Sequence, residues 1–380
     1  MNGVVRSALA LALLASTVLA CSGGEPPRAP AAAVSTMPGD GHGGQGGGQG
    51  ASPAPSPSPS ASLSPPALTL KDASRALDTF LETDEVLRAA HADRWAYQLT
   101  QDGQRPITIA EIRTQGGRRP VRYRWDHRTV LVPRQSGAAQ WFAATAERHG
   151  GQSGKQDGKQ GGARTGVFVF VRQSQDGPWR NSFASLLNSG EKPPAVELDA
   201  EGYATSLGSR DSSVAISPNL MGPLHATVAE EGPKGYASGL IAPGPQTTGF
   251  YDQISRTKAQ LKNDDCMAYE SIFASTPNYP IFALRTRDGG ALTMYTLIRT
   301  SSWITSASSQ GRGIKCGEGR PLAVPAAARW LLSPTKDLIV HQKRQIVETQ
   351  QYVSAVPPKA STAPVHVVGY QGLVTGGFNR

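Results

Sequence analysis

Arginine side chains gather in one short stretch of this chain, and arginine is well suited to bind phosphate or carboxylate through paired hydrogen bonds. A single acidic residue, Asp126, lies among them. Apolar residues alternate with arginine over residues 121–125, which predicts a half-buried strand with Arg122 and Arg124 on one face. The candidate anion-binding face comprises Arg118, Arg119, Arg122 and Arg124, with Arg113, Arg128 and Arg134 close by in the sequence. The alternative is a solvated face whose counter-charges lie on neighbouring strands.

Aromatic side chains occupy the same region. Tyr123 and Trp125 fall on the strand face opposite the arginines, and Trp141 and Phe170 lie in two strands predicted further along the chain. Because small-ligand pockets are concave and rich in aromatic side chains, these four residues form a candidate pocket. The alternative is that they belong only to the hydrophobic core.

Motifs of known catalytic sites are incomplete or missing. Ser-x-x-Lys, the nucleophile pattern of penicillin-binding proteins, begins at Ser189, Ser255 and Ser333, but the Lys-Thr-Gly of that class does not occur. Lys155 and Lys159 each follow glycine, yet glutamine comes next where a phosphate-binding loop needs serine or threonine. The histidines show no metal-ligand spacing. We therefore predict no catalytic residue, no metal site and no cofactor, and we expect a non-enzymatic protein.

The first cysteine ends a short targeting signal. Arg6 precedes an apolar run that is too short to cross a bilayer, which takes roughly 20 apolar residues. The signal closes on Val18-Leu19-Ala20-Cys21, which resembles the lipobox of bacterial lipoproteins. The resemblance implies a signal peptide over residues 1–20, palmitate or other acyl chains on Cys21, and a lipid anchor on the extracytoplasmic face of the cell membrane. The alternative is an ordinary secretory signal with a chance cysteine.

Two cysteines remain, Cys266 and Cys316. In a chain that matures in an oxidising compartment they most simply form a disulfide bond. Such a bond requires the two α-carbons to lie within about 7 Å. The alternatives are two buried free thiols or a metal-binding pair that lacks other ligands.

Composition separates a tether from a folded part. Residues 21–66 are rich in glycine, proline and serine and poor in apolar residues, so we expect a disordered tether. The formal net charge of +9 favours acidic partners, and anionic cell-wall polymer or lipid is the kind expected at a cell surface. We expect no nucleic-acid partner outside the membrane.

The folded part begins with helices. Thr69 and Asp72 resemble a capping box before a helix that carries apolar residues up to Leu81, and further helices are predicted over 84–97 and 107–112. Strands are then predicted over 121–125, 129–132, 140–147 and 167–172, with a hairpin turn at Asp176-Gly177. A glycine-rich mobile loop, 149–166, precedes the last of these strands.

The same order of elements recurs in the second half of the chain. Helices are predicted over 220–228 and 250–261, and strands over 268–275, 280–285, 291–299, 345–353 and 365–370. Helices followed by antiparallel strands, twice over, predict an α+β fold of two tandem domains, residues 67–215 and 216–380. Each domain is expected to have N-terminal helices packed on a curved antiparallel sheet.

The lipobox, the tether and this helix-then-strand order together resemble uncharacterised lipoproteins of high-GC Gram-positive bacteria. The two domains resemble the cone-shaped α+β fold of nuclear-transport-factor-like and cystatin-like proteins. The resemblance implies a concave sheet that can hold a pocket, and it carries over no functional residue.

These observations predict a membrane-anchored, extracytoplasmic lipoprotein that acts as a binding or interaction module for a cell-envelope component or a small ligand. One alternative is an enzyme with a pocket in a cone-shaped domain. Another is a structural or assembly partner of a second secreted protein. The oligomeric state is not predicted.

Overall fold

The computed structural model of this chain describes residues 68–115, 122–135, 139–150, 163–261, 266–305 and 316–380. The signal peptide, Cys21, the tether, Arg118, Arg119 and most of the 149–166 loop lie outside these described residues. The α-helices are α1 (Leu70–Ala89), α2 (Asp93–Leu99), α3 (Gln104–Gln115), α4 (Pro218–Glu231) and α5 (Thr248–Leu261). The strands of the large sheet are β1 (Arg124–Leu131), β2 (Gln140–His149), β3 (Arg164–Arg172), β4 (Arg180–Leu187), β5 (Met267–Ser275), β6 (Phe282–Arg285), β7 (Ala291–Thr305), β10 (Lys343–Val356) and β11 (His366–Asn379).

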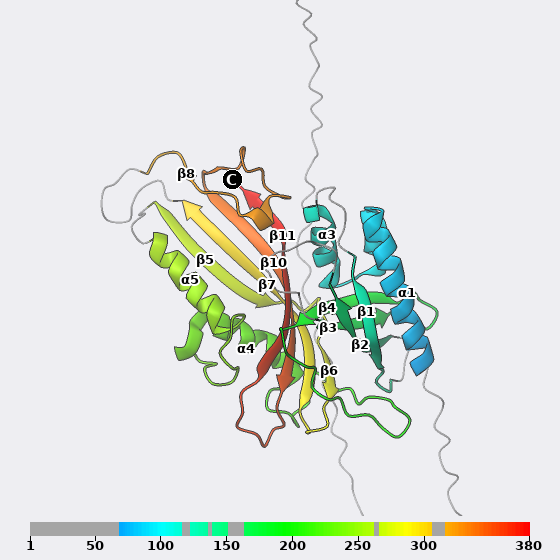
Figure 1. The fold of residues 1–380 in the computed structure, drawn as a ribbon. Helices are drawn as coiled ribbons and strands as arrows, with labels where there is room; N and C mark the ends of the chain where they lie inside the picture. Colours follow the sequence, from blue (N-terminus) through cyan, green and yellow to red (C-terminus); the bar gives the residue numbers. More distant parts are fainter. Residues whose placement is uncertain (1–67, 116–121, 136–138, 151–162, 262–265, 306–315) are drawn as a thin grey trace, which may run out of the picture. The chain divides into compact units, whose positions relative to one another are not determined.

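One antiparallel sheet runs through the described residues, in the order β1-β2-β3-β4-β11-β10-β7-β5, with β6 also paired to β7 (Figure 1). Two short strands, β8 (Arg320–Pro321) and β9 (Ile339–Val340), pair separately. Helix α1 packs on β1 and α3 on β4 and β11, whereas α4 and α5 pack on β5. The α+β class and the antiparallel sheet predicted from the sequence are therefore confirmed.

Helix α1 begins where the sequence predicts but ends later. The Thr69 hydroxyl accepts a hydrogen bond from the Asp72 amide, which caps the first turn. The predicted separate helix over 84–97 is wrong, because α1 continues without a break to Ala89. The ion pair between Asp84 and Arg88, one turn apart, supports this continuation. The chain then breaks at His91, which has a positive φ of 52°, and α2 follows.

The predicted strands 121–125 and 129–132 are one element. Strand β1 starts only at Arg124, so Arg122 and Tyr123 precede it rather than lying within it. The pairing of β1 with β2 shifts register between Asp126 and Thr129, where His127 has a φ of 49°. This irregularity interrupts the alternation of side chains and explains why the sequence pattern reads as two strands.

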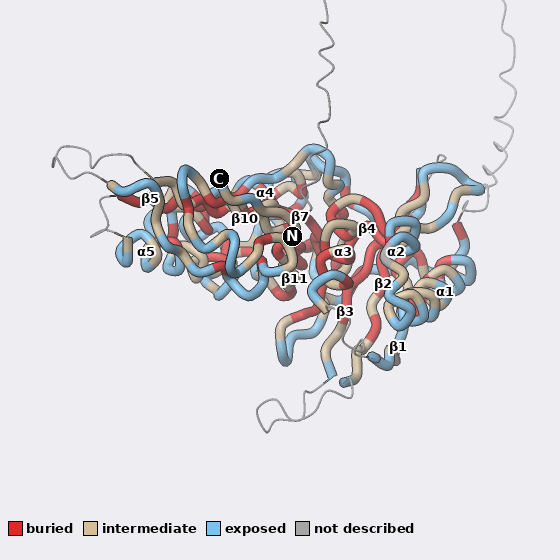
Figure 2. Tube along the Cα trace, turned by 90° about the horizontal axis from the view of Figure 1, so that it is seen from above, coloured by how far each residue is buried: buried red, intermediate tan, exposed pale blue. Residues whose placement is uncertain are grey.

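The hydrophobic core has members on both sides of the middle of the chain. One cluster lies wholly before residue 204 and another wholly after residue 206. A third cluster contains Leu131 and Phe183 together with Leu284 and Val353, so it joins the two halves. Figure 2 shows buried residues along the strands and exposed residues along the outer side of α1. Leu63–Arg380 form one compact unit, and the division into two tandem domains stays a prediction.

Two features hold in place the described segment that precedes β10, residues 316–342. Cys266 and Cys316 form the predicted disulfide bond, with their α-carbons 5.5 Å apart. Arg344, on β10, is fully buried, and its guanidinium donates to the carbonyl oxygen of Leu322 at 2.7 Å. The same side chain donates to the amide oxygen of Asn379 at 3.2 Å. The disulfide bond therefore holds this segment at residue 316, and the hydrogen bonds of Arg344 hold it against β10.

Candidate functional site

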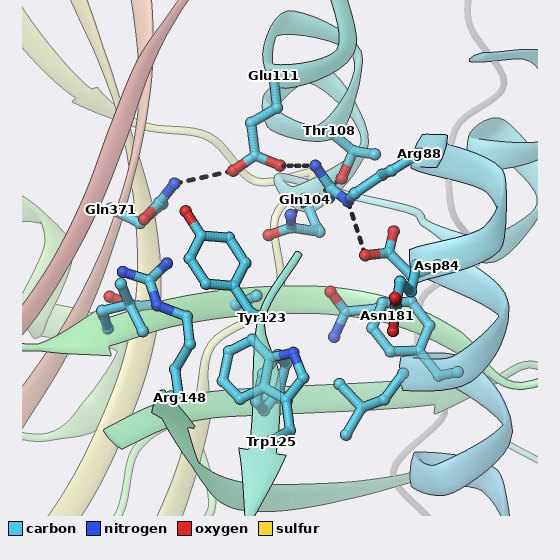
Figure 3. A pocket seen from close by; sticks show the side chains of 18 of the residues that line it. Asp84, Arg88, Gln104, Thr108, Glu111, Tyr123, Trp125, Arg148, Asn181 and Gln371 are labelled. Atoms are coloured by element: carbon cyan, nitrogen blue, oxygen red, sulfur yellow. Dashed lines mark hydrogen bonds and ion pairs between the residues drawn. The ribbon is translucent and has the colours of Figure 1, made fainter. Parts of the chain in front are cut away.

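A cavity of about 200 Å³ lies between helices α1 and α3 and the sheet formed by β1 to β4, with β11 at its edge (Figure 3). Its sheet side is apolar and aromatic. Trp125 and Phe168 meet edge to face, with ring centroids 5.2 Å apart. Gly166 makes this packing possible, since a Cβ at that position would lie 2.8 Å from the Trp125 ring. Phe80 and Leu81 of α1 close the opposite side.

Two helices contribute a network of charges to the cavity wall. The guanidinium of Arg88 lies between Asp84, at 2.7 Å, and Glu111, at 2.8 Å. The second oxygen of Glu111 accepts a hydrogen bond from the Gln371 amide at 3.0 Å. Burial alone would lower the pKa of Arg88, but the two carboxylates outweigh it and hold this pKa above its ordinary value. The network fixes α1 to α3 and α3 to β11.

Two buried amide side chains line the cavity (Figure 3). Asn181 is fully buried and uses its amide nitrogen to donate to the carbonyls of Val169, at 3.1 Å, and Phe183, at 2.9 Å. Gln104 is 5% exposed and donates to the Thr108 hydroxyl at 3.0 Å. The amide oxygens of Asn181 and Gln104 have no hydrogen-bond partner among the described residues. Buried acceptors of this kind normally have partners, and each of these two oxygens has less than 1 Å² of accessible surface, so both are unsatisfied atoms within the cavity wall.

Arg148, the penultimate residue of β2, supplies a further charge. Its guanidinium stacks over the Tyr123 ring at 4.3 Å from the centroid. Burial lowers the pKa of Arg148, although Tyr123 and Glu111 oppose the effect. Across the described part of the chain, no carboxylate lies within ion-pair distance of this guanidinium. Arg148 therefore differs from Arg88, which two carboxylates neutralise.

The described arginines of the predicted anion-binding face already have acidic neighbours. Arg122, at the exposed rim of the cavity, lies 3.6 Å from Glu85, and Arg124 lies 2.7 Å from Asp126. Nearby, Arg128 pairs with Asp78 and Arg134 with Asp199, both from outside the stretch. Arg118 and Arg119 lie outside the described residues, so the anion-binding face stays a prediction. The arrangement of Arg122 and Arg124 matches the alternative of a solvated, ion-paired face.

The four aromatic residues of the predicted pocket lie in different places. Tyr123 and Trp125 line the cavity described above. Trp141 lines a second cavity of about 340 Å³, next to Phe282. Phe170 is fully buried and stacks on Phe142 at 5.0 Å, so it belongs to the core. The structure thus brings two of the four residues together at one cavity.

Several lining residues were not singled out by the sequence. Arg148 follows the predicted strand 140–147 by one residue, and its position opposite Trp125 in the β1–β2 register depends on the irregularity in β1. Asn181 and Gln104 look like ordinary polar residues in the sequence. The sequence analysis predicted no strand over 180–187, so the burial of Asn181 in β4 became visible only in the structure.

On the other part of the sheet, the space beneath α5 is filled by a buried arginine. Arg299, on β7, is 3% exposed and donates to the Ser271 hydroxyl at 3.0 Å and to the Gln253 amide oxygen at 3.1 Å. Its guanidinium also lies 5.0 Å from the Phe250 ring centroid. These contacts tie α5 to β5 and β7, so this arginine has a structural role.

His, Cys, Asp and Glu side chains form no group of three or more that could hold a metal ion within residues 68–380, outside the gaps named above. In that same part of the chain, none of the helices combines the length and the apolar character needed to cross a membrane.

Comparison with curated proteins finds similarity to lipoproteins of Streptomyces. An uncharacterized lipoprotein of Streptomyces coelicolor is 24% identical over 165 residues, which cover 43% of this chain and 45% of that protein. One of Streptomyces avermitilis is 24% identical over 183 residues, 48% of each chain. A second Streptomyces coelicolor lipoprotein is 26% identical over 263 residues, 63% of this chain and 68% of its own length. The match thus spans less than half the length of the first two relatives.

No solved structure matches this chain. Residues 64–377 match the family described as Domain of unknown function (DUF8094), and this range includes every residue that lines the cavity. Because the match extends over most of the sequence, the chain belongs to the DUF8094 family.

Proposed function

We propose that this protein is a membrane-anchored, extracytoplasmic and non-enzymatic lipoprotein that binds a small ligand from the cell envelope in the cavity between α1, α3 and β1 to β4. The observation that carries the proposal is the cavity of about 200 Å³ itself, which has an aromatic wall and includes the buried amide side chains of Asn181 and Gln104 in its lining. An unpaired buried acceptor costs roughly 1–3 kcal/mol, and a ligand could offset that cost at Asn181 or Gln104 only if the amide turned its oxygen into the cavity. The aromatic wall supplies apolar contact area.

In this proposal the two predicted domains have different tasks. The first, residues 67–215, supplies all but one of the cavity-lining residues, and the exception is Gln371 of β11. In the second, residues 216–380, the Arg299 network fills the space between α5 and strands β5 and β7. The resemblance to the cone-shaped fold supports this reading, because that fold places its pocket between the helices and a curved sheet.

Filling the cavity is expected to abolish ligand retention. Ala184 lines the cavity opposite Phe168, so a phenylalanine in its place would occupy the space beside Trp125. The full chain in detergent would be dialysed against the low-molecular-weight fraction of a cell-envelope extract. Mass spectrometry should find a small molecule enriched with the wild type and absent with Ala184→Phe.

The matched control is Ala200→Phe, because Ala200 is exposed and lies outside the cavity. This variant should retain the molecule as the wild type does, and urea denaturation should show that both variants fold. Equal retention by Ala184→Phe would exclude the cavity as the binding site. Recovery of a converted product instead of the original molecule would favour the alternative of an enzyme.

The lipid anchor is tested at Cys21. Replacing Cys21 with alanine is expected to prevent acylation and to release the protein from membranes in detergent-free fractionation, since the acyl chains provide the proposed membrane attachment. The names of the lipoprotein relatives support this expectation. A Cys21→Ala variant that remains in the membrane fraction to the same extent as the wild type would contradict it.

A further inference from the structure

Three arginines line the cavity, and they differ in how their charge is balanced. Arg88 has two carboxylate partners and Arg122 has one. Arg148 has none within ion-pair distance among the described residues, although it is partly buried. Glu111 is the acidic residue that acts on it at longer range, and its oxygens are already bonded to Arg88 and Gln371. A partly buried cation without a counter-ion is costly unless an anion approaches it.

A second arginine increases the positive charge beside Arg148. Arg164, on β3, lies directly opposite Arg148 in the β2–β3 register. Its guanidinium donates to the carbonyl oxygen of Leu187 at 2.8 and 3.1 Å, so a neutral group is its partner. Like charges directly opposite each other on neighbouring strands destabilise a sheet. An anion in the cavity would relieve this repulsion.

The orientation of Arg148 leaves its hydrogen-bonding edge available. Its flat face stacks on the Tyr123 ring, and no hydrogen bond from its N–H groups to a described residue is present. Stacking uses the face of a guanidinium and leaves the N–H donors in its plane, which match the geometry of a carboxylate or a phosphate. Figure 3 shows this guanidinium on the side of the cavity near Gln371, with Asn181 on the other side of Tyr123 and Trp125.

We propose that Arg148 binds an oxyanion of the ligand, so that the cavity selects small molecules with one carboxylate or phosphate group and an apolar body. The proposal rests on the proposed function and adds the class of ligand. It also assigns anion binding to Arg148, whereas the sequence pointed to Arg118, Arg119, Arg122 and Arg124, of which Arg122 lies at the rim of the same cavity. The aromatic side chains between the two polar ends would contact the body of the ligand.

The test is isothermal titration of the full chain with inorganic phosphate and with acetate, against chloride at the same ionic strength. The wild type is expected to bind at least one of the two oxyanions more tightly than chloride, and the tighter one identifies phosphate or carboxylate as the group. Arg148→Gln should weaken that binding at least about tenfold, the effect of removing a charged hydrogen-bond partner. Arg148→Lys keeps the charge and should bind with intermediate affinity.

The matched control is Arg75→Gln, because Arg75 is exposed on α1 and pairs with Asp72 away from the cavity. It should bind the oxyanion as the wild type does. Equal binding by Arg148→Gln, or no oxyanion binding by the wild type, would overturn the proposal.

The dialysis experiment separates this proposal from the proposed function. If Arg148→Gln retains the same envelope molecule as tightly as the wild type, while Ala184→Phe loses it, the cavity binds a ligand without an oxyanion at Arg148. If Ala184→Phe also retains the molecule, both the proposed function and this proposal fail.

Discussion

Replacing both Cys266 and Cys316 with alanine is expected to lower the free energy of unfolding by about 4 kcal/mol. The two residues are 50 positions apart, and their α-carbons lie 5.5 Å from each other in the folded chain. A covalent link across a loop of this length restricts the unfolded chain far more than the folded one, which already holds the two residues together. Urea denaturation of the full chain, with and without the double substitution, measures the difference.

The reduced wild type provides a control for this result. A reductant should lower the wild-type denaturation midpoint to that of the double variant, and it should leave the midpoint of the double variant unchanged. If the wild type keeps its midpoint after peptide mapping shows both thiols to be free, the bond does not stabilise the fold.

Acidification is expected to destabilise the fold through His225, a fully buried residue of α4. Burial lowers the pKa of His225 from 6.5 to about 4, and a hydrogen bond to the Gln246 carbonyl only partly opposes this. Between these values the unfolded chain binds a proton that the folded chain does not, so stability falls as pH falls. The contribution is complete above pH 6.5, and about 3 kcal/mol should be lost by pH 4.

The hydrogen bonds of His225 explain why its neutral form is required. Nε2 lies 2.6 Å from the Gln246 carbonyl oxygen, which can only accept, so Nε2 carries the proton. Nδ1 then accepts from the Tyr295 hydroxyl at 2.8 Å. A second proton on the imidazole would break this bond and place a charge between Tyr295 and Tyr352, whose rings meet the imidazole edge to face.

Free energies of unfolding measured at pH 4 to 7 for the wild type and for His225→Gln test this prediction. Glutamine can donate to Gln246 and accept from Tyr295 but does not titrate, so the variant should lose most of the pH dependence in this range. His366→Gln, at an exposed histidine, should keep it. Carboxyls with a lowered pKa, such as Asp199 and Asp288, act below about pH 4 and do not interfere. A decline in His225→Gln equal to that of the wild type would contradict the assignment.

Local patterns in the sequence predicted many of the elements, because those elements depend on neighbours in the chain. The Thr69 cap and the apolar residues spaced along α1 are of this kind, as is the buried run of β3. The sequence predicted the ends of these elements less accurately. The end of α1 depends on the positive φ of His91, which the residue types around it do not predict.

The cavity could not be predicted in the same way, because its wall is assembled from side chains far apart in the sequence. Glu111 and Gln371 are separated by 260 residues and meet only because β11 lies beside β4. The arginine stretch was predicted to bind anions because its charges are adjacent in the sequence. In the folded chain, however, Arg122 and Arg124 lie beside acidic residues. Arg148 has no other arginine close to it in the sequence, and only the fold places it beside Tyr123 and opposite Arg164.

The contact between Gln371 and Glu111 couples the cavity to the cohesion of the sheet. Strand β11 pairs with β10 along most of its length but meets β4 at only two residue pairs, Gly369 with Leu187 and Tyr370 with Leu186. A ligand that needs the complete wall binds more tightly to molecules in which this narrow junction is closed. By thermodynamic linkage, the same ligand then favours the closed junction by the same factor. If the cavity binds a ligand as proposed, loading of the cavity and separation of β4 from β11 would therefore oppose each other.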